Sequence, residues 1–385
     1  MARVSKKYPK RLSPRFVVPL VIVVVLAGAV ALYAAQGNDP RDFPRDAAAR
    51  LQILAGRARQ ASQDAVASVE PAHNSGEPSE HIALYFAPGT RLRGGDIDDA
   101  LLAYLRSARK SIRCAFYDFE YVEAAKVLVE KHKDGLEVGI VSDSGYKDRD
   151  AVQLCIQAGI PVVFDERRPF MHDKFCIVDD SIVWTGSTNI TENCLFRNDN
   201  NSLKIVSAQL AEDYTAEFRE MFDTHKFGPR SPRGTPYKDV QVDGIAIRCL
   251  FAPEDGVRDE ILREIQDANT SITFMAFSFT SAEIAKAMAE RIKDGVKVRG
   301  LFEKRNAGSA YSEDEFLARR GAEIHMDTNS NTMHNKVIVV DAEVVITGSY
   351  NFSANAEKDN DENVLILRSR GIAEQYEAQY RKLVN

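Results

Sequence analysis

The chain has 385 residues, of which 50 are Lys or Arg and 56 are Asp or Glu, so its formal net charge is -6. A content of 44% apolar and 28% charged residues excludes a disordered, collagen-like or disulfide-scaffold protein, and the length is sufficient for two or three domains. The charge is uneven, because residues 1–15 contain six basic and no acidic side chains. Removing those six leaves 44 basic against 56 acidic residues, and such an acidic body is a poor general binder of polyanions.

The N-terminal segment has the pattern of a membrane anchor. The basic stub 1–15 precedes twenty uncharged residues at 16–35, which as a helix would be about 30 Å long and match the bilayer core. A cleaved signal peptide, with Ala29-Val30-Ala31 as its cleavage site, is the alternative. The excess of basic residues before the span predicts a cytoplasmic N-terminus and a periplasmic or extracellular body under either interpretation.

The rest of the chain divides into a stalk and two similar copies of one unit. Residues 36–80 are predicted to be a stalk or linker, because 46–69 are Ala-rich with scattered charge and 70–80 contain Pro, Gly and Ser. The copies occupy 81–228 and 245–385, and the three prolines of 229–244 predict a linker between them.

Within each copy, helical and strand patterns alternate. The expected helices are 96–111 and 123–135 in the first copy and 258–271 and 282–295 in the second. The expected strands are 112–119, 136–141 and 159–164, then 272–279, 296–302 and 321–326. This alternation predicts an α/β fold with a largely parallel sheet in each copy.

The cysteines do not identify the compartment. There are five of them, without metal-ligand spacing, and we expect buried free thiols, although one disulfide is possible in an exported body.

One motif recurs near the end of each copy with identical spacing. The six positions it contains are His172, Lys174, Asp179, Gly186, Ser187 and Asn189, repeated as His334, Lys336, Asp341, Gly348, Ser349 and Asn351. Side chains alternate along a strand, so the His and the Lys of each copy share one face. The apolar runs around residues 179–181 and 341–343 predict hairpins that place position 172 opposite 188 and 334 opposite 350. The Gly-Ser-x-Asn segment therefore returns beside the His.

These residue types suit phosphate chemistry. Lys ammonium groups and amide and hydroxyl donors bind anionic oxygens, and the Lys face carries no carboxylate, so we expect neither a metal nor another cofactor. Phosphodiester cleavage needs a nucleophile and an acid for the leaving oxygen. Two copies facing each other would provide one His for each role within a single chain, so a monomer is sufficient for a complete site.

His-x-Lys-x4-Asp followed by Gly-Ser-x-Asn, present twice, resembles the phospholipase D superfamily. The resemblance covers both copies and implies two homologous α/β/α sandwich lobes with a metal-independent site between them. It implies a phosphohistidine on His172 and an acid/base role for His334. It further implies phosphate binding by the paired Lys and Asn residues, with the serines in support.

Other positions enter the expected site through the same resemblance. Asp179 and Asp341 belong to the motif and are included in the catalytic set. Glu362 lies 28 residues after His334, where the family commonly places a carboxylate that orients a His. Asn200 has the same offset from His172, so the two halves are chemically unequal.

The substrate is not fixed by these residues. A predicted anchor and an acidic body favour a membrane-bound phospholipase D that hydrolyses phospholipid head groups. A metal-independent endonuclease and a cardiolipin-synthase-like phosphatidyl transferase are the alternatives. The intact motif positions disfavour a non-catalytic binding module.

Overall fold

The computed structural model describes residues 79–88 and 97–384. The predicted basic stub, membrane span and nearly all of the stalk lie outside these residues. Within them, no helix is both long enough and apolar enough to cross a bilayer.

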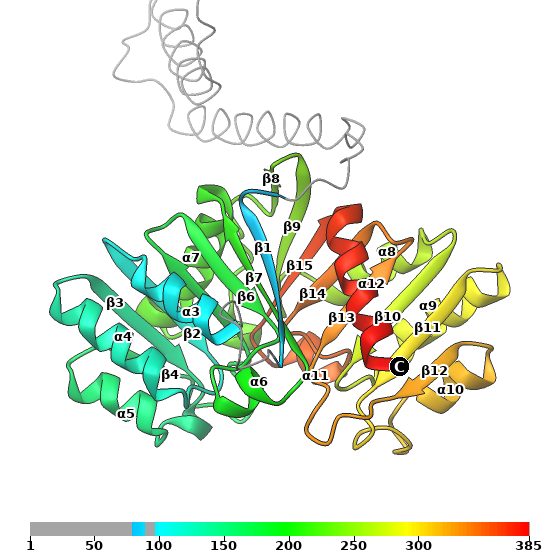
Figure 1. Cartoon of the computed structure of the whole chain (residues 1–385), viewed down its shortest axis with the longest axis horizontal. Coiled ribbons are helices and arrows are strands. Elements are labelled where there is room, and N and C mark those ends of the chain that lie inside the picture. The colour runs from blue at the N-terminus through cyan, green and yellow to red at the C-terminus, as the bar shows by residue number, and fades with distance from the viewer. Residues whose placement is uncertain (1–78, 89–96, 385) are drawn as a thin grey trace, which may run out of the picture. The chain divides into compact units, whose positions relative to one another are not determined.

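Lobe 1 is built on a sheet in the strand order β1-β7-β6-β5-β2-β3-β4 (Figure 1). Its strands are β1 (Ile82–Ala87), β2 (Ser111–Phe116), β3 (Glu137–Ser142), β4 (Val162–Phe164), β5 (Lys174–Val178), β6 (Ile182–Gly186) and β7 (Asn200–Val206). Its helices are α3 (Ile97–Arg106), α4 (Val122–Lys133), α5 (Asp150–Gln157), α6 (Glu192–Phe196) and α7 (Ala208–Thr224).

Lobe 2 repeats this plan and adds one strand, in the order β12-β11-β10-β13-β14-β15-β9-β8. Its strands are β8 (Asp239–Val242), β9 (Ile245–Ala252), β10 (Ser271–Ala276), β11 (Lys297–Phe302), β12 (Glu323–Met326), β13 (Lys336–Val340), β14 (Val344–Gly348) and β15 (Glu362–Arg368). Its helices are α8 (Val257–Gln266), α9 (Ala282–Lys293), α10 (Asp314–Arg319), α11 (Ala354–Lys358) and α12 (Arg370–Val384).

The sheets are mixed, which corrects the expectation of largely parallel ones. Within the described residues, only β2-β3-β4 and β10-β11-β12 pair in parallel. The other strand pairs are antiparallel. Short hairpins join β5 to β6 and β13 to β14, and the chain then reverses direction again, so that β7 pairs antiparallel with β6 and β15 with β14. The predicted linker 229–244 is also partly wrong, since it contains β8, which pairs with β9.

The hairpin register agrees with the sequence-based prediction. Phe175 pairs with Thr185 and Val337 with Thr347, which places 172 opposite 188 and 334 opposite 350. Both turn residues of each hairpin have positive φ angles, for example 54° at Asp179 and 53° at Asp341. Two-residue hairpin turns need this conformation, which Asp tolerates better than most residues.

The lobes share one apolar core in addition to their own. In β5, Cys176 and Val178 pack under the outer helices of lobe 1, whereas Phe175 and Ile177 face the other lobe. The shared core contains residues of α7 and α12 and of both sheets. The two sheets are thereby brought together near the middle of the body, where β6 of lobe 1 contacts β14 of lobe 2 (Figure 1).

Candidate active site

The two motif histidines lie immediately before β5 and β13, where the lobes meet. The backbone N–H of His172 donates to the carbonyl oxygen of Asp361 at 2.9 Å, and that of His334 donates to Asp199 at 2.8 Å. Asp361 belongs to lobe 2 and Asp199 to lobe 1. Each histidine is therefore held by the backbone of the opposite lobe, in a pseudo-twofold arrangement.

The imidazole rings are also oriented across the lobe boundary. Nδ1 of His172 lies 2.7 Å from a carboxylate oxygen of Glu362, whereas Nδ1 of His334 lies 2.9 Å from the amide oxygen of Asn200 and 3.1 Å from the carbonyl oxygen of Ser187. Because acceptors surround Nδ1, that nitrogen carries the proton in the neutral rings and Nε2 keeps its lone pair. The two rings differ in that only His172 has a carboxylate partner.

The motif serines donate hydrogen bonds to the residues that orient the histidine rings. Ser349 donates its hydroxyl hydrogen to Glu362 at 2.6 Å, and Ser187 donates to the amide oxygen of Asn200 at 3.0 Å. These contacts engage each hydroxyl with the residue that orients a histidine, and a supporting part of the serines in phosphate binding stays a prediction.

The motif lysines are almost completely buried. Nζ of Lys174 donates to the carbonyl oxygen of His172 at 2.6 Å, and Nζ of Lys336 donates to that of His334 at 2.7 Å. An ammonium group has three donors, so each lysine keeps two hydrogens for a ligand.

An aromatic ring adjoins each His–Lys pair, and sequence reasoning missed both rings. Tyr117 follows β2. Its ring centroid lies 4.6 Å from the ring centroid of His172 and 4.7 Å from Nζ of Lys174. Phe277 follows β10, with corresponding distances of 4.8 Å and 4.7 Å in lobe 2. The sequence feature that could have revealed these two rings is the presence of an aromatic residue at the same position of both repeats. Cation–π contact helps to keep each ammonium group charged while it is buried.

Asn189 and Asn351 are half-buried beyond the serines. Their Oδ1 atoms are buried without a hydrogen-bond partner among the described residues. Phosphate binding by these amides stays a prediction.

Asp179 and Asp341 lie at the opposite ends of β5 and β13 from the histidines, which corrects their inclusion in the catalytic set. The carboxylate of Asp179 accepts hydrogen bonds from the backbone N–H groups of residues 109–111, and Asp341 does the same with residues 269–271. Burial opposes ionisation, but these backbone donors keep both carboxyl pKa values below their ordinary range. The two aspartates fasten the hairpin turns to the neighbouring strands.

Burial and mutual repulsion dominate the electrostatics of the site. Burial, followed by the two lysine charges, lowers the pKa of His172 and of His334 well below the ordinary value. Burial also lowers the pKa of Lys174 to about 8 and raises the pKa of Glu362 to about 7. An entering anion would relieve the repulsion among the cations and favour their charged forms.

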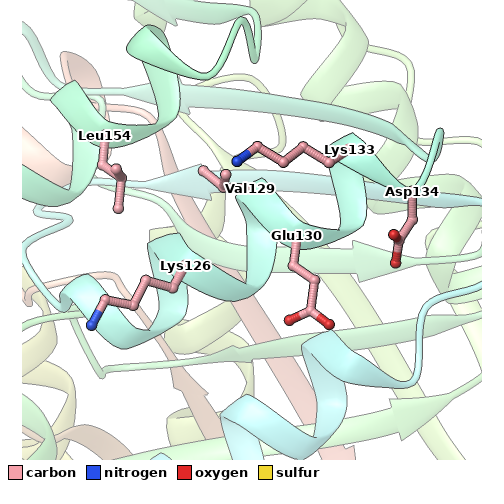
Figure 2. A pocket seen from close by; sticks show the side chains of 6 residues that line it. All are labelled: Lys126, Val129, Glu130, Lys133, Asp134 and Leu154. Atoms are coloured by element: carbon pink, nitrogen blue, oxygen red, sulfur yellow. The ribbon is translucent and has the colours of Figure 1, made fainter.

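The motif histidines are nearly buried, with exposed fractions of only 6% for His172 and 8% for His334. Two hollows lie elsewhere in the described part of the chain. One of about 420 Å³ is on the outer helices α4 and α5 (Figure 2), and one of about 490 Å³ is lined by residues such as Glu120 and Arg149. Neither contains the motif histidines or lysines.

Across residues 79–88 and 97–384, no group of three or more His, Cys, Asp or Glu side chains could hold a metal ion.

Comparison with known proteins agrees with this geometry. The family model described as "Cardiolipin synthase, PLD-like domain" matches residues 101–222 and 261–384, one match in each lobe and together more than half of the chain. Phospholipase D of Rickettsia felis is 32% identical over 159 residues, which is 41% of this chain and 80% of the relative. Mitochondrial cardiolipin hydrolase of Xenopus tropicalis is 30% identical over 135 residues, 35% of this chain and 64% of the relative.

A solved structure matches both lobes together. Phosphatidylserine synthase of Haemophilus influenzae superposes with a TM-score of 0.58 over 78% of this chain and 86% of that one, at 14% identity, which shows a shared fold. With two family-model matches and two His–Lys pairs at the junction of the lobes, the chain belongs to the phospholipase D superfamily and is a phosphodiester hydrolase.

Proposed function

We propose that the protein is a membrane-anchored phospholipase D that hydrolyses head-group phosphodiester bonds through a covalent phosphohistidine. The observation that carries this proposal is the pair of imidazoles whose Nδ1 atoms have unequal partners, a carboxylate for His172 and an amide for His334. The predicted domains 81–228 and 245–385 would supply the two halves, and the predicted anchor at 16–35 would hold them at the bilayer with the N-terminus in the cytoplasm. Two relatives named for phospholipid hydrolysis support lipid as the substrate.

In the first step, Nε2 of His172 attacks phosphorus. A P–N bond forms while the bond from phosphorus to the leaving alcohol oxygen breaks. The attacking ring gains positive charge, and the Glu362 carboxylate at 2.7 Å from Nδ1 stabilises that charge. The carboxylate partner therefore favours His172 as the nucleophile.

Once a bound phosphate diester favours the charged form of His334, its imidazolium carries a proton on Nε2 and donates that proton to the leaving oxygen. Its partner is the neutral amide of Asn200, which stabilises an imidazolium less than a carboxylate would. A less stabilised imidazolium is a stronger acid, and this favours His334 in the general-acid role.

In the second step, the roles reverse for a water molecule. Nε2 of His334 takes a proton from water, the hydroxide oxygen bonds to phosphorus, and the P–N bond breaks with its electron pair returning to His172. The products are the free alcohol and phosphatidic acid. Lys174 and Lys336 would neutralise charge on the phosphoryl oxygens in both steps, and the amide N–H₂ groups of Asn189 and Asn351 would donate hydrogen bonds to them.

Two alternatives use the same chemistry. Phe170 is 46% exposed and its ring lies 5.4 Å from that of Tyr117, so bases of a single-stranded nucleic acid have an aromatic surface on which to stack. This observation favours an endonuclease as the second candidate. A phosphatidyl transferase would differ only in the second step, where an alcohol replaces water, and the matching family model is described by a synthase.

The decisive experiment uses the full chain reconstituted in mixed phospholipid vesicles, with EDTA present, and offers single-stranded DNA in a parallel reaction. Release of head groups with intact DNA supports the proposal, whereas DNA cleavage with intact lipid overturns it. Added glycerol distinguishes the transferase, which would form a new phosphodiester in place of phosphatidic acid. A variant with both His172→Ala and His334→Ala is the control for contaminating activity.

A further inference from the structure

Two buried cysteines face each other across neighbouring strands of lobe 1. Cys114 in β2 and Cys176 in β5 are direct partners in the antiparallel register, and their Sγ atoms are 2.8 Å apart. Opposed residues of an antiparallel pair have Cα atoms about 4.5 to 5.5 Å apart, within the range of about 4.4 to 6.8 Å that disulfides span. The backbone therefore already has the spacing that a bridge requires.

The equivalent residue pair in lobe 2 shows which side chains fill this position when it serves core packing alone. Phe274 and Ile338 occupy the same register between β10 and β13, and both are buried in the outer core of lobe 2. The fold therefore needs an apolar pair here, without any covalent link. In lobe 1 both partners are thiols whose sulfur atoms are directed at each other, which bulk packing alone does not require.

We propose that Cys114 and Cys176 form a cross-strand disulfide in the mature protein. The inference rests on the proposed export of the body, because disulfides persist in oxidising compartments and are rare in the cytosol. It does not depend on the substrate. The two thiols would be oxidised by exchange with the disulfide of a thiol–disulfide oxidoreductase, which takes up two electrons and two protons and becomes a dithiol.

The disulfide would form before lobe 1 has folded completely. Both side chains are fully buried in the folded lobe, so an oxidant cannot reach them afterwards. Burial also raises the pKa of the Cys114 thiol well above its ordinary value, which removes the reactive thiolate from the folded protein.

A bridge at this place would join two segments of the candidate site. Strand β2 leads directly to Tyr117, and β5 begins with Lys174, whose Nζ lies 4.7 Å from the Tyr117 ring centroid. The link would fix the relative position of the two strands from which the ring and the ammonium group extend.

The test is to express the full chain with its N-terminal segment in a bacterium that exports it, quench with acid, and block free thiols in denaturant with N-ethylmaleimide. Peptide mass spectrometry is then done with and without reduction. We expect three blocked cysteines and one linked peptide pair containing Cys114 and Cys176. Cys155→Ser should leave this linkage intact, and the bridged protein should melt at a higher temperature than Cys114→Ser.

A second arm of the experiment distinguishes a wrong cysteine pairing from a wrong prediction of the cellular compartment. The reduced full chain is refolded in a glutathione redox buffer and analysed in the same way. Five free thiols in both arms would overturn the pairing itself. A linkage formed in the buffer but absent from cells would overturn oxidation in the cell and count against export. Neither result bears on hydrolysis, which is measured separately on phospholipid vesicles and tests the proposed function alone.

Discussion

The carboxylate of Glu362 in lobe 2 lies 2.7 Å from Nδ1 of His172 in lobe 1. The matching position in lobe 1 is Asn200, whose amide oxygen lies 2.9 Å from Nδ1 of His334 in lobe 2. Each lobe thus provides the group that orients the histidine of the other. The difference between a carboxylate and an amide is the main chemical asymmetry of the site.

Substitution of the histidines should separate their roles. With an aryl phosphodiester, whose leaving group needs no protonation, His334→Ala should still form the phosphohistidine but hydrolyse it slowly, because the group that activates water is lost. His172→Ala should form none. With a phospholipid, both variants should lose roughly 10³-fold or more of kcat. Rapid-quench mass spectrometry detects the intermediate, and its accumulation in His172→Ala alone would reverse the assignment.

Replacing the amide by a carboxylate should weaken the acid. Asn200→Glu places a negative charge beside His334 and raises the pKa of its imidazolium, so proton donation to a poor leaving group becomes slower. Hydrolysis of an aryl phosphodiester should change little. The ratio of the two rates measures the effect, with Asn200→Gln as the neutral control. An equal loss on both substrates would indicate damage to the site instead.

Glu362→Gln should exchange activity for stability. The pKa of Glu362 is raised to about 7 in the fold from an ordinary 4.5, so the unfolded chain loses this proton first as the pH rises. The folded state therefore loses stability between pH values of about 4.5 and 7, and the full cost applies above pH 7. Glutamine has no such ionisation cost, so the stability of Glu362→Gln relative to the unsubstituted protein should rise by on the order of 1 to 3 kcal/mol from pH 5 to pH 8.

The same variant should have lower kcat, because His172 loses its anionic partner. Chemical denaturation at pH 5 and pH 8 tests the stability effect, which should be much smaller at pH 5. An equal effect at both pH values would show that ionisation of Glu362 is not its cause.

Asp179→Ala should affect the fold and spare the chemistry. The carboxylate accepts hydrogen bonds from three successive backbone N–H groups, and the loss of such a cap costs about 1 kcal/mol. We expect a lower melting temperature with kcat/KM nearly unchanged for folded protein. Asp341→Ala is the matched variant in lobe 2. A large loss of kcat/KM in well-folded Asp179→Ala would restore this residue to the catalytic set.

Local spacing predicted the local part of the site. The period of two along a strand, together with the apolar runs flanking Asp179, was sufficient to predict the hairpin that returns residue 188 beside residue 172. Spacing could not show that Glu362 contacts His172, because that contact depends on how the lobes pack through their shared core. It also gave no distinction between a serine that binds phosphate and one, such as Ser349, that binds the orienting carboxylate.

The errors have a similar origin. Alternating helices and strands indicate parallel pairing only when each strand is followed by a crossover, and the strands that carry Lys174 and Lys336 lead into hairpins instead. The aspartates share a motif with the histidines because one hairpin contains both, with one residue at the turn and the other near the open end. Proximity in sequence therefore did not mean proximity to phosphate.

The crossed contacts between the lobes have an evolutionary consequence. If two identical single-lobe chains met in this way, any substitution at the orienting position would alter both histidines at once, and the two rings would remain equivalent. A chain that contains both lobes is free of this constraint, because Asn200 and Glu362 are encoded separately and can mutate independently. Duplication within one gene therefore permits each ring to be tuned to a single step of the reaction.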